Sequence, residues 1–458
     1  MAQTHKNEEQ LATAPIGRLM LKLAVPTVAA QLINMLYNIV DRIYIGHIPE
    51  VGSTALTGVG VTFPIITLVS AFAAFAGQGG APLASIQLGA GRRDEAERIL
   101  GNSLVLLLAA SLLLTVGFSM YKEPILYAFG ASDATIGYAV DYIRIYLLGT
   151  IFVQLALGLN SFISAQGKAL VAMLSVLIGA ILNIVLDPIF IFALDMGVRG
   201  AALATVLAQG VSAAGIALYG WRRVPLLRLE RRHCKVSRGE LGRIMNYSLL
   251  TCVQQSVMNF GILMVQGLVN SFGVNVMAAF AAAVKIDAFA YLPVQDFGNA
   301  FSTFVAQNTG AQKAERIRKG IRSALWVSVG FCLVSSLLVC LFAAPLMGLF
   351  VEPGETEIIA VGVEYLRIEG MCYCGIGILF LLYGLFRGLG RPGVSVVLTV
   401  VSLGTRVALA YLLAPIPAVG LKGIWWAVPI GWVLADLAGL VLYRRKPLPA
   451  ETACAPEG

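Results

Sequence analysis

Charged residues are scarce in this chain of 458 residues. Only 13% of them are Asp, Glu, Lys or Arg, and 58% are hydrophobic, whereas soluble domains contain about 25% charged residues. This scarcity excludes an ordinary soluble domain and predicts an integral membrane protein. The formal net charge is +8, but the basic residues lie in short segments between apolar runs. That pattern is typical of membrane topology and argues against nucleic-acid binding.

Residues and signatures typical of several other protein classes are also few or missing. The three His residues lie far apart, at positions 5, 47 and 233, so a His-rich metal site is not expected. The seven Cys residues include no C-x-x-C pair, which indicates free thiols rather than a disulfide framework. Neither HExxH nor GxSxG occurs, so we expect no enzyme and no cofactor. The polar first 15 residues lack a signal-peptide apolar region, so the first span is expected to direct insertion.

Long apolar runs are abundant, and a helix that spans a bilayer needs about 20 such residues. Twelve segments fit, and we predict an all-α membrane protein with spans at 19–47, 53–82, 99–121, 136–163, 169–194, 199–220, 243–270, 275–305, 323–350, 359–387, 393–414 and 422–443. Lys and Arg concentrate in alternate loops, at 92–98, 222–243 and 313–322. By the positive-inside rule both termini are cytoplasmic.

The chain also repeats itself. "YIRI" at 142–145 recurs as "YLRI" at 365–368, and "MGVRGAALA" at 196–204 recurs as "VGLKGIWWA" at 419–427, both 223 residues later. Six spans per half give two pseudo-symmetric six-helix lobes in the same orientation around a central cleft, which suits alternating access by a monomer. The predicted divisions are a tail (1–18), a lobe (19–220), a basic linker (221–242), a second lobe (243–443) and a second tail (444–458).

Two carboxylates interrupt the apolar runs of the first half. Asp41 and Asp187 each follow a Lys by 19 residues, at Lys22 and Lys168, so each lies roughly 28 Å along an outward-running helix. A carboxylate at the bilayer centre costs about 2.5–3.5 kcal/mol on insertion scales, so such residues are retained where they serve a function. Asn183 is one helical turn before Asp187 and shares its face.

Thr205 is placed at a similar depth on the next span. Two carboxylates, an amide oxygen and a hydroxyl would form an oxygen cage for Na⁺ or for a shared proton. The alternative is structural: Asp41 pairs with Arg42, and Asp187 caps a helix break before Pro188. At the repeat positions of Asn183, Asp187 and Thr205 the second half has Arg406, Ala410 and Val428. The second half was therefore expected to lack the acids, which favours a one-sided cation site.

Several segments resemble the multidrug and toxic-compound extrusion (MATE) family, over roughly residues 15–445. They are "AVPTVAAQLINMLYNIVDRIYIG" at 24–46, "LGAGRRDEAERI" at 88–99, "LNIVLDPIFIF" at 182–192 and "MGVRGAALATV" at 196–206. The pattern is similar to the bacterial drug-exporting branches, which implies a place in a bacterial cytoplasmic (inner) membrane. The resemblance implies secondary antiport of bulky organic cations, such as dyes, quaternary ammonium antiseptics and fluoroquinolones, in exchange for Na⁺ or H⁺.

The resemblance also assigns roles to residues. It places cation coupling at Asp41, Asn183, Asp187 and Thr205, with Tyr142 nearby, and it places Tyr37 and Asn160 in the wall of the drug cavity. To this substrate cleft we add further polar residues of the apolar spans: Asn34, Gln255, Asn259, Lys285, Asp287 and Asp296.

The second half departs from some branches of the family, which carry an acid on the seventh span. Here that span has Gln255 and Asn259 but no acid, so coupling by that route is not expected. Two interpretations of the eighth span stay open. Either Lys285 forms a structural pair with an acid, or Lys285 and Asp287 contact substrate; Asp296, after Pro293, is the better candidate for meeting a cation.

Other transport functions were weighed against the antiporter. A flippase of a lipid-linked or amphipathic substrate would share the two-lobe architecture, but it needs a cleft rich in Arg and Lys, and only Lys285 and Arg406 qualify. A channel would need a filter loop, and none is visible. Carboxylates and hydroxyls bind both Na⁺ and H⁺, so the sequence does not distinguish the coupling ions.

Overall fold

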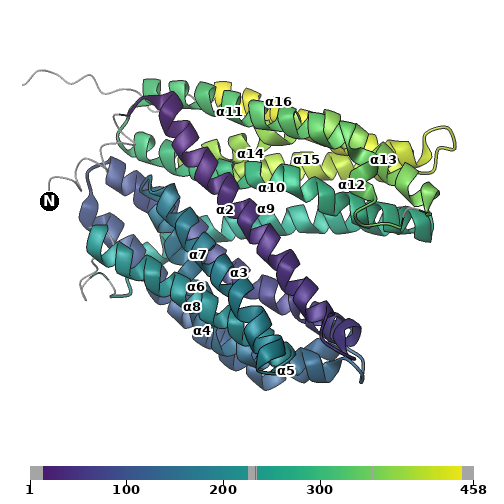
Figure 1. Ribbon diagram of the computed structural model, residues 1–458. Helices are drawn as coiled ribbons and strands as arrows, with labels where there is room; N and C mark the ends of the chain where they lie inside the picture. Colours follow the sequence, from purple (N-terminus) through teal and green to yellow (C-terminus); the bar gives the residue numbers. More distant parts are fainter. Residues whose placement is uncertain (1–13, 225–232, 234, 353, 446–458) are drawn as a thin grey trace, which may run out of the picture. The chain divides into compact units, whose positions relative to one another are not determined.

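The computed structural model describes residues 14–224, 233, 235–352 and 354–445. Within these ranges the chain is all-helical (Figure 1), as predicted. The first half contains α2 (Ile16–Gly46), α3 (Gly52–Gly89), α4 (Arg93–Ala128), α5 (Ile136–Leu148), α6 (Thr150–Ala165), α7 (Ala169–Pro188), the π-helix η1 (Ile189–Ala193) and α8 (Val198–Arg223). The second half contains α9 (Arg238–Asn270), α10 (Val274–Gly310), α11 (Ala314–Leu341), α12 (Ala343–Met347), α13 (Thr356–Met371), α14 (Tyr373–Gly388), α15 (Pro392–Leu413) and α16 (Gly420–Arg445).

The number of membrane spans agrees with the sequence. Among the described residues, 10 helices are long and apolar enough to cross a bilayer, and two bent helix pairs raise the number to 12. The spans predicted over 136–163 and 359–387 are present as bent helix pairs rather than as single helices. Each is broken, by a bend of 56° between α5 and α6 and of 54° between α13 and α14. The breaks fall at Gly149 and Cys372, which are 223 residues apart, so the bend is part of the internal repeat.

The described residues form two compact units. One lies within Ala29–Ser248, and the other combines residues of Ala12–Val28 with those of Leu249–Gly458. Residues 19–28, predicted in the first lobe, group with the second unit, and the first residues of α9 group with the first. The predicted linker 221–242 is helical at both ends, because α8 extends to Arg223 and α9 begins at Arg238. Most of its middle, and most of both predicted tails, lie outside the described residues.

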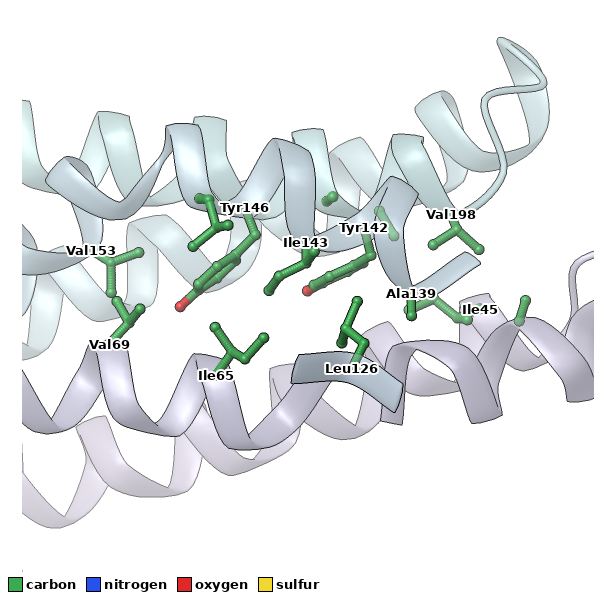
Figure 2. Close-up of a cluster of buried hydrophobic side chains, with 14 of the residues drawn as sticks. Ile45, Ile65, Val69, Leu126, Ala139, Tyr142, Ile143, Tyr146, Val153 and Val198 are labelled. Atoms are coloured by element: carbon green, nitrogen blue, oxygen red, sulfur yellow. The ribbon is translucent and has the colours of Figure 1, made fainter. Parts of the chain in front are cut away.

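An apolar cluster holds the helices of the first unit together. In Figure 2, Tyr142, Ile143 and Tyr146 of α5 face Ile65 and Val69 of α3. The two tyrosine rings stack with centroids 6.2 Å apart. Because long apolar side chains and rings pack here without gaps, α5 has a fixed rotation, and that rotation determines where the Tyr142 hydroxyl points.

Small residues let the helices of the second unit approach closely. A Cβ atom on Gly384 of α14 would lie 2.2 Å from the Gly298 carbonyl oxygen of α10. Aromatic side chains of the second unit also pack together. Phe280 stacks on Trp425 with ring centroids 5.5 Å apart, and Tyr365 meets the same Trp425 ring edge-on with centroids 4.9 Å apart. Close backbone approach through glycine is the usual way in which membrane helices gain packing energy without a hydrophobic driving force.

Candidate functional site

A polar cluster lies inside the first unit, where α7 and α8 pack together. The Asn183 amide Nδ2 donates hydrogen bonds to Asp187 Oδ1 at 3.2 Å and to Thr205 Oγ1 at 3.4 Å. Asp187 and Asn183 are 0% and 2% exposed. The spacing of four residues therefore brings the amide and the carboxylate together as expected, and α8 adds the hydroxyl.

Asp41 of α2 completes this cluster. Its carboxyl group lies within interaction distance of that of Asp187. Asp41 Oδ1, Asp187 Oδ2 and Asn183 Oδ1 are buried and have no hydrogen-bond partner among the described residues. Two carboxylates that face each other in a buried site repel unless a proton or a cation lies between them. The geometry thus suits a small, positively charged occupant with oxygen ligands.

Two tyrosines border the acids. The Tyr142 hydroxyl lies beside Thr205, and its ring is 4% exposed. Tyr37 lies beside Asp41 and reaches the Gln209 side chain of α8. The structure therefore brings together Asp41, Asn183, Asp187 and Thr205 with both tyrosines that the sequence analysis selected in the first half.

For Asp187 the structural alternative does not agree with the helix geometry, whereas for Asp41 it stays open, because the charge of Arg42 acts on that carboxyl group. Helix α7 does not break at Pro188 but continues as the π-helix η1, in which the Leu194 amide donates to the Ile189 carbonyl at 2.9 Å. Asp187 therefore caps no helix end. Arg42 places its guanidinium 5.5 Å from the centre of the Phe63 ring. Single π-helical turns inside membrane or soluble helices are frequently found at functional sites.

A small cavity adjoins the polar cluster. Its volume is about 40 Å³, and its polar lining comes from Asn34, Tyr37, Asn160, Asn183, Thr205 and Gln209. A buried water needs roughly 10–15 Å³ on this measure, so the cavity has room for about three waters or a hydrated ion but not for a dye. Three predicted substrate residues of the first half, Asn34, Tyr37 and Asn160, thus line the same space as the coupling residues.

The predicted substrate residues of the second half differ in how deeply they are buried. Gln255 and Asn259 are exposed on α9. Lys285 is exposed and lies 5.9 Å from the centre of the Phe350 ring, whereas Asp287 is 6% exposed. The structure gives no ion pair between Lys285 and an acid among the described residues, and the cation that acts on Asp287 is Arg406.

Asp296 belongs to a network between two helices. It accepts a hydrogen bond from Asn299 Nδ2 at 3.4 Å, and Asn299 Oδ1 accepts one from Arg387 at 2.6 Å. This arrangement ties α10 to α14. The half-buried Asp296 side chain is therefore engaged with its own helix neighbour, and its predicted contact with a cation stays a prediction.

The sequence analysis missed two buried acids of the second unit. Glu369 and Asp436 are 1% and 9% exposed. The expectation of a second half without acids therefore holds at Arg406, Ala410 and Val428 but not for the second unit as a whole. The signal was present, since Glu369 directly follows the repeated "YLRI" segment. The repeat alone does not indicate this acid, because the first half has Tyr146 at the corresponding position.

Comparisons with known proteins identify the family. A family model described as MatE matches residues 26–189 and again 250–412. The chain belongs to the MatE family. Its two matches fall on the two halves of the repeat. This MATE protein is thus a multi-pass membrane transporter of a multidrug efflux family, and the expectation that it is not an enzyme is confirmed by its membership.

Individual relatives match over nearly the whole length. A "FAD transporter" of Shewanella oneidensis is 25% identical over 98% of this chain and 99% of its own. "Multidrug export protein MepA" of Staphylococcus haemolyticus is 25% identical over 94% of each chain. A solved structure, "Crystal structure of MATE in the bent conformation", superposes with a TM-score of 0.87 at 25% identity, covering 96% of this chain and 97% of that one.

Proposed function

We propose that this transporter exports amphipathic organic cations in exchange for Na⁺ or H⁺, and that the coupling ion binds at Asp41, Asn183, Asp187 and Thr205. One observation carries the proposal. The Asp41 and Asp187 carboxyl groups face each other inside the first unit, and each has an oxygen without a partner among the described residues. Such a pair is stable only with a positive occupant, and an exchangeable occupant is what an antiporter requires.

Occupation of the site changes the force between two helices. With no ion, the carboxylates of α2 and α7 repel; with a proton or Na⁺ between them they attract. A ligand shifts a conformational equilibrium by as much as its affinity differs between the two states. Binding of the coupling ion therefore favours the conformation in which Asp41 and Asp187 are close, and loss of the ion favours the other.

The substrate class is supported by the relative named a multidrug export protein. The equally similar relative named a FAD transporter supports a second candidate function, the export of an amphipathic organic anion. A flippase of similar architecture would also move a substrate of this kind. Cytoplasmic termini, the inner membrane and function as a monomer remain predictions.

The test is efflux from proteoliposomes under an imposed Na⁺ gradient or an imposed pH gradient. We expect ethidium efflux under one of the two gradients, which identifies the ion, and we expect Asp187→Asn to abolish it. Asp133→Asn is the matched control, because Asp133 is exposed and accepts a hydrogen bond from the Tyr127 hydroxyl at 3.0 Å. Efflux that needs no gradient, or a fully active Asp187→Asn variant, would refute the coupling site. Transport of FAD but not of ethidium would favour the second candidate.

A further inference from the structure

The second unit contains a pocket of its own, enclosed by α9, α10, α13, α14, α15 and α16. Its volume is about 80 Å³. Aromatic rings form much of the wall, including Tyr291, Phe380 and Trp432, and the charged side chains of Asp287, Glu369 and Arg406 line it as well. At roughly 10–15 Å³ for each water, the pocket has room for about five to eight waters, or for one small methylated ammonium group.

The charged residues of this pocket are deeply buried yet incompletely bonded. Asp287, Glu369 and Arg406 are 6%, 1% and 9% exposed. Within the described part of the chain, Asp287 Oδ1, Glu369 Oε1 and Arg406 Nε have no hydrogen-bond partner. Buried polar groups are normally bonded, so each exception requires an explanation. Three such atoms around one cavity indicate that a ligand or water completes the bonding.

The charges do not balance inside the pocket. Two ionised carboxylates and one guanidinium leave a net charge of −1, which one monovalent cation, or one proton shared by the two acids, neutralises. A shared proton would not fill the cavity, whereas a cation would. The aromatic walls favour a weakly hydrated organic cation, because ring faces attract quaternary ammonium groups and water is excluded from them. A self-contained structural ion cluster would instead be neutral, fully bonded and without a cavity.

We propose that this pocket binds the ammonium group of an organic cation, and that Arg406 sets the negative charge available to it. The choice of an organic cation rests on the proposed function. Arg406 acts as a resident cation: it leaves one negative charge for the ligand instead of two. Removal of the guanidinium should therefore strengthen cation binding, and removal of one carboxylate should weaken it.

The test measures binding of tetramethylammonium to the purified full-length protein, by quenching of tryptophan fluorescence. Trp432→Phe identifies the signal, since Trp432 lines the pocket. We expect Arg406→Met to tighten binding at least about tenfold and Glu369→Gln to weaken it at least about tenfold. The double variant restores the net charge of −1 and should return to the wild-type affinity. Arg406→Lys should also bind like wild type.

The control is Glu364→Gln, on the same helix as Glu369 but paired with Lys422 outside the pocket. It should bind like wild type. Asp287→Asn replaces Glu369→Gln if the latter does not fold, with the same expected result. Affinities that do not follow the net charge, or variants that alter only the melting temperature, would overturn the proposal. Because binding needs no gradient, it can fail while coupled efflux stays intact, and the reverse.

Discussion

Asn183 makes the sharpest prediction about the coupling site, because one amide group connects three parts of it. Its Nδ2 bonds Asp187 Oδ1 at 3.2 Å and Thr205 Oγ1 at 3.4 Å, while its Oδ1 has no partner among the described residues. Replacement of Asn183 by Ala removes the donor that orients the carboxylate and one oxygen that would bind Na⁺. Replacement of Thr205 by Ala removes only a hydroxyl, whose hydrogen bond to Asn183 is longer than that of Asp187 and joins two neutral groups.

The two substitutions should differ in size. A hydrogen bond to a charged group contributes about 1.5–3 kcal/mol, whereas a neutral one contributes about 0.5–1.5 kcal/mol. Since about 1.4 kcal/mol is tenfold in an equilibrium constant, Asn183→Ala should weaken binding of Na⁺ roughly 10- to 150-fold and Thr205→Ala roughly 2- to 10-fold. If the coupling ion is H⁺, the sign for Asn183→Ala reverses, because an amide that donates to the Asp187 carboxylate stabilises its charged form and so opposes proton binding. Thr205→Ser keeps the hydroxyl and should stay near wild type.

The assay is the initial rate of ethidium efflux at increasing concentrations of the coupling ion, which gives the half-saturating concentration for each variant. Asn275→Ala is the matched control, because Asn275 is an exposed residue of the second unit and donates a hydrogen bond to Glu357 at 2.8 Å. A larger effect of Thr205→Ala than of Asn183→Ala would refute this assignment of ligands. So would an unchanged half-saturating concentration in both.

Two further predictions concern stability. Gly384→Ala should destabilise the second unit by about 1–3 kcal/mol, because its Cβ would lie 2.2 Å from the Gly298 carbonyl oxygen. In the control Gly393→Ala, the added Cβ would meet nothing within 4 Å, so the melting temperature should not change. Equal melting temperatures of the two variants would contradict the packing argument. Asn102→Ala should cost about 1–3 kcal/mol, because the buried amide bonds Lys235 O and the Ser237 amide. Proteolysis between α8 and α9 should be faster in Asn102→Ala but not in the exposed-site variant Asn275→Ala. Equal rates in the two variants would contradict this predicted loss of stability.

The sequence predicted those features that depend on spacing along one helix. Asn183 and Asp187 share a face because they are four residues apart, and the bond between them follows directly. The depth of Asp41 and Thr205 followed from counting residues at a fixed rise. The bends at Gly149 and Cys372 did not follow, because both sides of each bend are equally apolar and hydropathy carries no information about helix direction.

The features that depend on helix rotation could not be predicted in this way. Lys285 and Asp287 are two residues apart, and only the packing of α10 shows that one is exposed while the other is buried. The same holds for Glu369, which the α13 packing turns into a pocket of the second unit. Neighbours from other helices decide such contacts, and no local pattern encodes them.

Arg406 shows how the two halves of the repeat have diverged. It occupies the position that Asn183 has in the first half, 223 residues earlier. Both side chains lie beside buried acids, since Asn183 bonds Asp187 and Arg406 acts on Asp287 and Glu369. An amide donates hydrogen bonds without neutralising the acids, so the first unit still requires a cation or proton from outside. A guanidinium supplies one positive charge permanently, so the two ionised acids of the second unit keep a net charge of −1, which a single monovalent cation can neutralise.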